Sequence, residues 1–151
     1  MLHAPLFGRP VPPPPPIGER PPFTPSSYLA LRRKAAGLTI DQVAELIVAQ
    51  ASRHALRSRQ IGRAAQIADL RTLLRQLETP GIVARLRATI DILAGTFPFD
   101  PDVYFQLATT PADRHPRICR GCGCTQEDAC TGGCRWAGQE ICTRCSNGEL
   151  F

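Results

Sequence analysis

The sequence of 151 residues predicts a mainly α-helical protein that ends in a small cysteine-rich, metal-binding module. Two observations carry this prediction. Apolar residues between 24 and 108 recur at the three-four spacing of amphipathic helices, without the alternation typical of strands. All seven cysteines fall between Cys119 and Cys145. We therefore divide the chain into a proline-rich tail (1–23), a helical domain (24–108), a linker (109–117) and a cysteine module (118–151).

The tail is defined by proline, because six of the fifteen prolines lie between Pro10 and Pro16. Proline fixes φ and lacks an N–H group, so the run from Val11 to Pro16 predicts polyproline II. A stiff or disordered arm is the simpler interpretation, and a ligand for an aromatic groove is the alternative. The start has no signal-peptide pattern, and no apolar run is long enough to span a membrane, which favours a cytoplasmic protein.

Two helix starts carry capping signals. Thr24 followed by Pro25 predicts the first helix, and the capping-box spacing of Thr39 and Gln42 predicts a second helix from Ile40. We expect the first helix to have one face formed by Tyr28, Leu31 and Ala35. In the second helix, we expect the inward residues to be Val43, Leu46 and Ile47.

The later helices are predicted from periodicity. One helix carries Ile67, Leu70, Leu74 and Leu77. Thr79-Pro80 predicts the start of the next, with Val83, Leu86, Ile90 and Leu93, and the two helices suggest an antiparallel hairpin. Asp100-Pro101 predicts one more short helix.

Positive charge is concentrated in the helical domain. The chain has a formal net charge of +5, and residues 27–95 carry eleven Lys/Arg against five Asp/Glu, a net charge of +6. A basic surface suits a polyanion such as nucleic acid, and it also suits solubility alone.

Two C-x-x-C pairs, Cys119/Cys122 and Cys142/Cys145, have the spacing of a tetrahedral four-cysteine zinc site. Two thiolates three residues apart converge on one ion only if the backbone turns tightly. Gly121 and Gly123 permit such a turn.

Three cysteines remain, namely Cys124, Cys130 and Cys134. They are spectators to one zinc ion, or they complete a second zinc site in which one thiolate bridges. An iron–sulfur cluster is a further alternative. A disulfide-rich knot is the alternative without a metal, and a reducing compartment disfavours it.

The module has few apolar residues, so metal binding would supply most of its folding free energy. Trp136 is most simply its packing residue, with base stacking as the alternative. The deaminase, Walker and nucleophile-elbow signatures are absent, and only His115 lies near the cysteines. A structural metal is therefore expected, and not an enzyme.

The segment Ser27–Ile47, with its Gly37-Leu38-Thr39 step followed by Gln42, Val43, Ala44 and Leu46, resembles the first two helices of Cro/repressor-type helix-turn-helix domains. The resemblance implies a third, recognition helix at about residues 52–61. The DNA-binding residues would then be Arg53, Arg57, Arg59 and Arg63.

The pattern from Cys119 to Cys145, with Trp136 inside it, resembles a cysteine module of uncharacterised bacterial and prophage proteins. The leading hypothesis is a small DNA-associated transcriptional regulator with one or two structural zinc ions. The alternatives are a protein–protein adaptor that docks through the module and an iron–sulfur redox sensor.

Overall fold

The computed structural model describes residues 20–54 and 62–148. Within them the chain forms six α-helices, and no strand occurs in these two ranges. A single β-bridge joins Trp136 to Cys142. The mainly helical prediction is therefore confirmed. The helices are α1 (Pro25–Ala35), α2 (Ile40–His54), α3 (Arg63–Leu77), α4 (Arg87–Ala94), α5 (Pro101–Thr109) and α6 (Thr143–Ser146), with a 3₁₀ turn, η1 (Ala112–Arg114), after α5.

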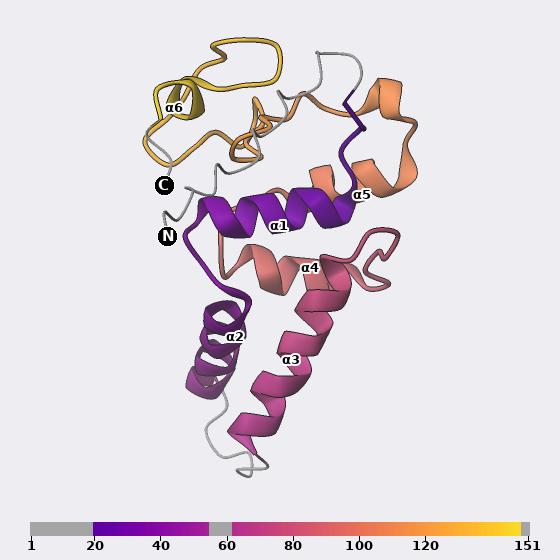
Figure 1. Ribbon diagram of the computed structural model, residues 1–151. Coiled ribbons are helices and arrows are strands. Elements are labelled where there is room, and N and C mark those ends of the chain that lie inside the picture. Colours follow the sequence, from indigo (N-terminus) through magenta and orange to yellow (C-terminus); the bar gives the residue numbers. More distant parts are fainter. Residues whose placement is uncertain (1–19, 55–61, 149–151) are drawn as a thin grey trace, which may run out of the picture.

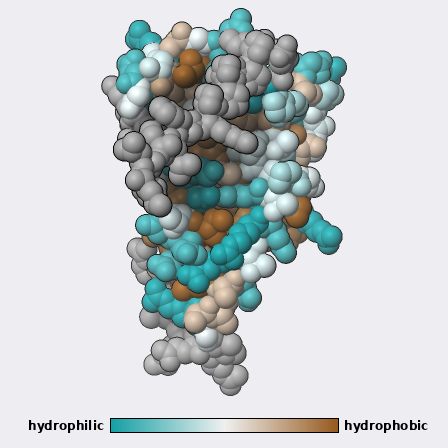
Figure 2. Space-filling view, viewed as in Figure 1, coloured by the Kyte–Doolittle hydropathy of each residue, from teal (hydrophilic) through white to brown (hydrophobic). Residues whose placement is uncertain are grey.

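Helix α1 lies across the middle of the molecule (Figure 1). The cysteine-rich segment with α6 lies on one side of it, and α2 and α3 extend away on the other side as an arm. Hydrophilic side chains cover much of the visible arm, and hydrophobic ones show where the arm joins the rest of the molecule (Figure 2). None of the described helices combines the length and apolarity required of a membrane span.

Both predicted capping signals are present. The Thr24 hydroxyl accepts a hydrogen bond from the backbone N–H of Ser27, and Pro25 is the first residue of α1. The Thr39 hydroxyl accepts from the N–H of Gln42 at 3.1 Å, and the Gln42 side chain accepts from the N–H of Thr39 at 2.8 Å. These reciprocal bonds satisfy orphan donors at the start of α2 and fix it at Ile40, as predicted.

One apolar core holds the helices together, and it includes four buried aromatic residues: Tyr28, Phe97, Phe99 and Tyr104. Tyr28 and Tyr104 are fully buried, and each hydroxyl accepts a backbone hydrogen bond, from Asp100 and Ala84 respectively. The other buried members are Leu29, Val43, Ala44, Leu74, Leu77, Ile90, Leu93, Val103, Leu107 and Ile118.

The predicted inward face of α2 is correct for Val43, which is buried, and for Ile47, which packs against the core. It is wrong for Leu46, which is 38% exposed. Ala44 is buried in its place. The reason is that α2 packs along α3 with the face that carries Val43 and Ala44, and Leu46 lies outside that face.

The predicted helix start at Thr79-Pro80 is wrong, because α4 begins only at Arg87. The Thr79 hydroxyl instead donates to the carbonyl of Arg75 and completes the end of α3. Gly81 then takes a left-handed φ of 84°. As a result Val83 and Leu86 are exposed, and only Ile90 and Leu93 of the predicted face are buried.

The predicted antiparallel pair is also different from the observed one. Helix α3 runs antiparallel to α2, and α4 packs on α5 (Figure 1). Sequence spacing alone favoured the neighbours α3 and α4. The non-helical segment between them, which binds the Tyr104 hydroxyl through Ala84, takes α4 away from α3.

Candidate metal centre

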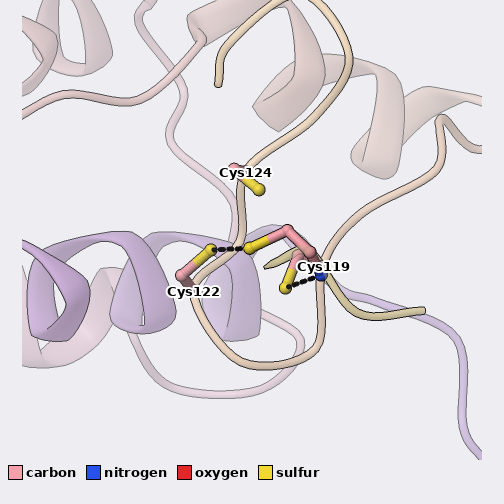
Figure 3. Close-up of side chains that lie close together, drawn as sticks. Cys119, Cys122 and Cys124 are labelled. Atoms are coloured by element: carbon pink, nitrogen blue, oxygen red, sulfur yellow. Dashed lines mark hydrogen bonds between the residues drawn. The ribbon is translucent and has the colours of Figure 1, made fainter. Parts of the chain in front are cut away.

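All seven cysteines come together in one cluster, and all seven are free thiols. Neighbouring Sγ atoms are 3.5 Å apart in Cys122–Cys130 and 3.6 Å apart in Cys119–Cys145 and Cys124–Cys134. These distances are far longer than the roughly 2.05 Å of a disulfide. Figure 3 shows how the side chains of Cys119, Cys122 and Cys124 gather within one turn of the chain.

Two glycines shape this turn and the space beside it. Cys119 closes it by donating to the carbonyl of Cys124, and Gly123 donates to the carbonyl of Cys119. A Cβ atom on Gly121 would lie 2.5 Å from the Cys145 sulfur, so a side chain there would displace that thiol. Gly123 has a φ of 77°, which disfavours any other residue. The predicted role in the turn is therefore confirmed for Gly123, whereas Gly121 gives room to the Cys145 sulfur.

Two sets of four sulfur atoms lie within 4.8 Å of one another and could each hold a metal ion. The first set combines the C-x-x-C pair Cys119/Cys122 with Cys124 and Cys142. The second set contains all three cysteines that the paired spacing left unassigned: Cys124, Cys130 and Cys134, with Cys142. Cys145, predicted as a ligand, belongs to neither set, but its sulfur lies 3.6 Å from that of Cys119.

Backbone N–H groups point at two of the sulfurs. The Cys142 N–H donates to Cys119 Sγ at 3.3 Å, and the Cys130 N–H donates to Cys134 Sγ at 3.4 Å. The hydrogen bond with the Cys122 thiol, together with the one from the Cys142 N–H, lowers the pKa of Cys119 to about 4. The same thiol contact and burial raise the pKa of Cys122. The cluster therefore favours at least one thiolate before any metal binds.

The cluster rests directly on α1. Ala35 packs against the cysteines, and the stem of Arg32 lies so close to Gly123 that a Cβ there would be 2.8 Å from Arg32 Cδ. The Arg32 guanidinium is 2.7 Å from the Asp128 carboxylate, and the Arg32 side chain is 5% exposed. An ion pair with so buried an arginine fixes the loop 125–130 onto the helix.

A second set of contacts joins the described end of the tail to the cysteine module. Arg120 donates to the carbonyl of Pro21 and lies 4.4 Å from the centroid of the Phe23 ring. Arg120 and Arg20 both pair with Glu140. Residues 20–23 thus lie against the module, whereas the polyproline run falls outside the described residues.

Trp136 packs against the cysteine cluster and pairs with Cys142 across the β-bridge. The Arg117 guanidinium covers its ring at 4.0 Å and donates to the carbonyls of Gly138 and Gln139. A ring covered on one face and packed on the cysteines matches the packing role expected for Trp136.

Sequence reasoning missed Arg32 and Arg144 as part of this region. Both line a hollow of about 280 Å³ whose wall also includes Cys122 and Cys130. Arg32 lies about ninety residues before the cysteines, so only the fold brings it there. The sequence signal for its role is that Arg32 begins a basic run, Arg32-Arg33-Lys34, within an amphipathic helix.

The predicted DNA-binding arginines are only partly described. Arg53 lies in the last turn of α2, which runs on through residues 52–54 and so leaves no turn before them. Arg63 is exposed and is the first residue of α3. Arg57 and Arg59, with most of the predicted recognition helix, fall outside the described residues, so that helix stays a prediction.

Comparison of the chain with protein-family models, curated proteins and solved structures gave no match.

Proposed function

We propose that the seven-cysteine cluster binds zinc and that the metal acts as the core of the C-terminal module. The sulfur spacing carries this proposal. Four thiolates about 2.3 Å from one zinc ion lie about 3.8 Å from one another. The closest sulfurs here are 3.5 to 3.9 Å apart. An iron–sulfur cluster places sulfide between its irons and would hold thiolates on different irons farther apart than a single zinc ion does.

The proposed role is structural because the candidate ligands are thiolates alone. Catalytic zinc keeps an open position, usually beside histidine or carboxylate ligands. His115, the histidine nearest in sequence, is engaged through Nε2 with the carbonyl of Thr110 and belongs to neither set of four. Four of the candidate ligands are almost fully buried: Cys119, Cys122, Cys124 and Cys142.

The test is elemental analysis of protein purified anaerobically, with an absorbance spectrum of the same sample. We expect zinc and no visible absorbance. Replacing zinc with Co²⁺ should produce the spectrum of tetrahedral thiolate ligation. A brown protein with iron and acid-labile sulfide would contradict the proposal and favour the redox-sensor alternative.

A second candidate function, DNA binding by the arm, is favoured by charge. The sequence from residue 46 to residue 68, which includes the end of α2 and the start of α3, contains four arginines and no acidic residue. The arm extends from the side of α1 opposite the cysteine module (Figure 1). A projecting element with unopposed positive charge suits the phosphates of a duplex. The whole protein would then be a small DNA-associated regulator.

This candidate is tested by titrating duplex DNA at low and moderate salt with the variant Arg53→Ala/Arg57→Ala. We expect weaker binding and a shallower dependence on salt, because phosphate contacts are lost. Arg85→Ala is the control, since Arg85 is exposed but lies in the segment before α4. Equal affinity of parent and double variant would remove DNA binding and leave the protein–protein adaptor as the better hypothesis.

A further inference from the structure

Cys142 occupies a special place in the cluster, because it belongs to both sets of four sulfurs. Its Sγ is 3.8 Å from Cys122, a member of the first set only, and 3.9 Å from Cys130, a member of the second set only. Its backbone N–H also donates to Cys119. Cys142 is therefore in contact with ligands from each side of the cluster.

Cys124 is the other shared cysteine, and its shortest contact with another sulfur is with the second set. Its Sγ lies 3.6 Å from Cys134, which belongs to the second set alone. If Cys124 is assigned to the second set, the first set needs another ligand. Cys145 is placed to supply it, since its sulfur is 3.6 Å from that of Cys119 and lies over Gly121.

We propose that the cluster binds two metal ions that share the Cys142 thiolate. One ion is held by Cys119, Cys122, Cys142 and Cys145, and the other by Cys124, Cys130, Cys134 and Cys142. Two tetrahedral ions need eight bonds, and seven thiolates provide them when one sulfur bridges. The inference rests on the proposed zinc function and adds the number of ions and the role of each cysteine.

Proton and charge balance agree with this assignment. Two Zn²⁺ ions bound by seven thiolates leave a formal charge of about −3, with no change of oxidation state, and the protons that the thiols still carry go to solvent. Arg32 and Arg144 line the hollow beside Cys122 and Cys130 and place positive charge there, of which Asp128 balances the part carried by Arg32. The Nε of Arg32 is buried and has no hydrogen-bond partner among the described residues, which leaves one donor for the thiolates.

The experiment compares zinc content in the full-length parent and in three variants. The parent should hold about two zinc ions per chain. Cys134→Ser and Cys145→Ser each remove a terminal ligand from a different site, so each should retain about one ion. Cys142→Ser removes the shared ligand and should weaken both sites, so that zinc is lost at a chelator concentration that the two other variants resist.

A measurement on the parent protein does not depend on whether a variant folds. After replacement of zinc by ¹¹³Cd, two cadmium resonances should appear and be coupled to each other through the bridging sulfur. One resonance, or two without coupling, would overturn the shared thiolate. A parent with one zinc ion would overturn the two-ion assignment but leave the proposed zinc function intact, whereas a parent without zinc would overturn both.

Discussion

The helical region and the cysteine region of this chain bury different kinds of atoms. The helical core consists of aliphatic and aromatic side chains, with Tyr28, Leu29, Val43, Ile90 and Tyr104 completely buried. In the cysteine region, the buried cluster consists of five cysteines, with Trp136 and Ala35 packed at its edge. Burial of apolar surface accounts for the first core. The second contains little such surface, so we expect bonds between a metal and the sulfurs to supply most of its stability.

The two regions meet on α1, which serves both. Ile118, directly before the first cysteine, belongs to the helical core, and Ala35 of α1 packs on the cysteines. Arg32 of α1 pairs with Asp128 of the module. The helical region thus offers a packed surface to the module, while Ile118 is the one residue of the described module, 118–148, that belongs to the buried helical core. This asymmetry predicts that the helices depend less on the metal than the module does.

Removal of the metal should have the largest effect and should separate the regions. Structural zinc contributes about 10–16 kcal/mol in small zinc-binding peptides. With a strong chelator under reducing conditions, we expect amides of residues 118–148 to lose protection from hydrogen exchange while those of α1, α4 and α5 keep it. Loss of most helical circular dichroism on chelation would show that the two regions share one cooperative core.

Truncation of the helical core should have the opposite pattern. Ile90→Ala removes a completely buried side chain and should lower the free energy of unfolding by about 2–5 kcal/mol. Ile92→Ala is the matched control, because Ile92 is in the same helix but 55% exposed, and it should cost less than about 0.5 kcal/mol. Urea denaturation measures both. Equal effects would contradict the placement of α4, and zinc content should be unchanged in each variant.

The ion pair at the boundary should have an intermediate effect. Asp128→Ala leaves the Arg32 charge buried and should destabilise the module by about 1–3 kcal/mol. The control is Asp102→Ala, which breaks an Arg87–Asp102 pair of similar length, 2.6 Å, between side chains that are more than half exposed. We expect almost no loss of stability there, because solvent screens an exposed pair. The readout is the chelator concentration that releases half of the zinc, which only Asp128→Ala should lower.

The smallest effect concerns the Tyr28 hydroxyl, which accepts a hydrogen bond from Asp100. Tyr28→Phe should cost about 1 kcal/mol at neutral pH. Burial raises the pKa of Tyr28 above its usual value of about 10, so the neutral phenol stabilises the folded state at lower pH. This contribution is lost as pH rises from about 10 through the folded-state pKa. Stability in urea should therefore fall less steeply above pH 10 in Tyr28→Phe than in the parent.

Local signals in the sequence predicted the helix starts that depend on neighbouring residues. Thr24-Pro25, the Thr39/Gln42 box and Asp100-Pro101 each begin a helix where expected, because their hydrogen bonds form within one turn. Thr79-Pro80 carries the same local pattern but ends α3. Long-range contacts, such as that between Ala84 and the Tyr104 hydroxyl, decide the path there, and a local pattern contains no information on them.

The candidate site shows the same division. The C-x-x-C spacing and the two glycines predicted the turn that gathers the first thiols. These features did not show how Cys124, Cys130 and Cys134 are placed relative to that turn, since their spacing allows several arrangements. The fold brings these three cysteines to Cys142, which is itself paired with Trp136 by the β-bridge. Arg32 joins the site only because α1 packs against the module, an event far away in sequence.

We infer that all seven cysteines form one metal centre and that this centre is the core of the module. The most direct measurement is thiol alkylation of the native, reduced protein, with and without a chelator, followed by mass spectrometry of each cysteine. We predict that all seven are protected with metal present and become reactive together when it is removed. Alkylation of Cys124, Cys130 and Cys134 at the same rate with and without the chelator would contradict the claim.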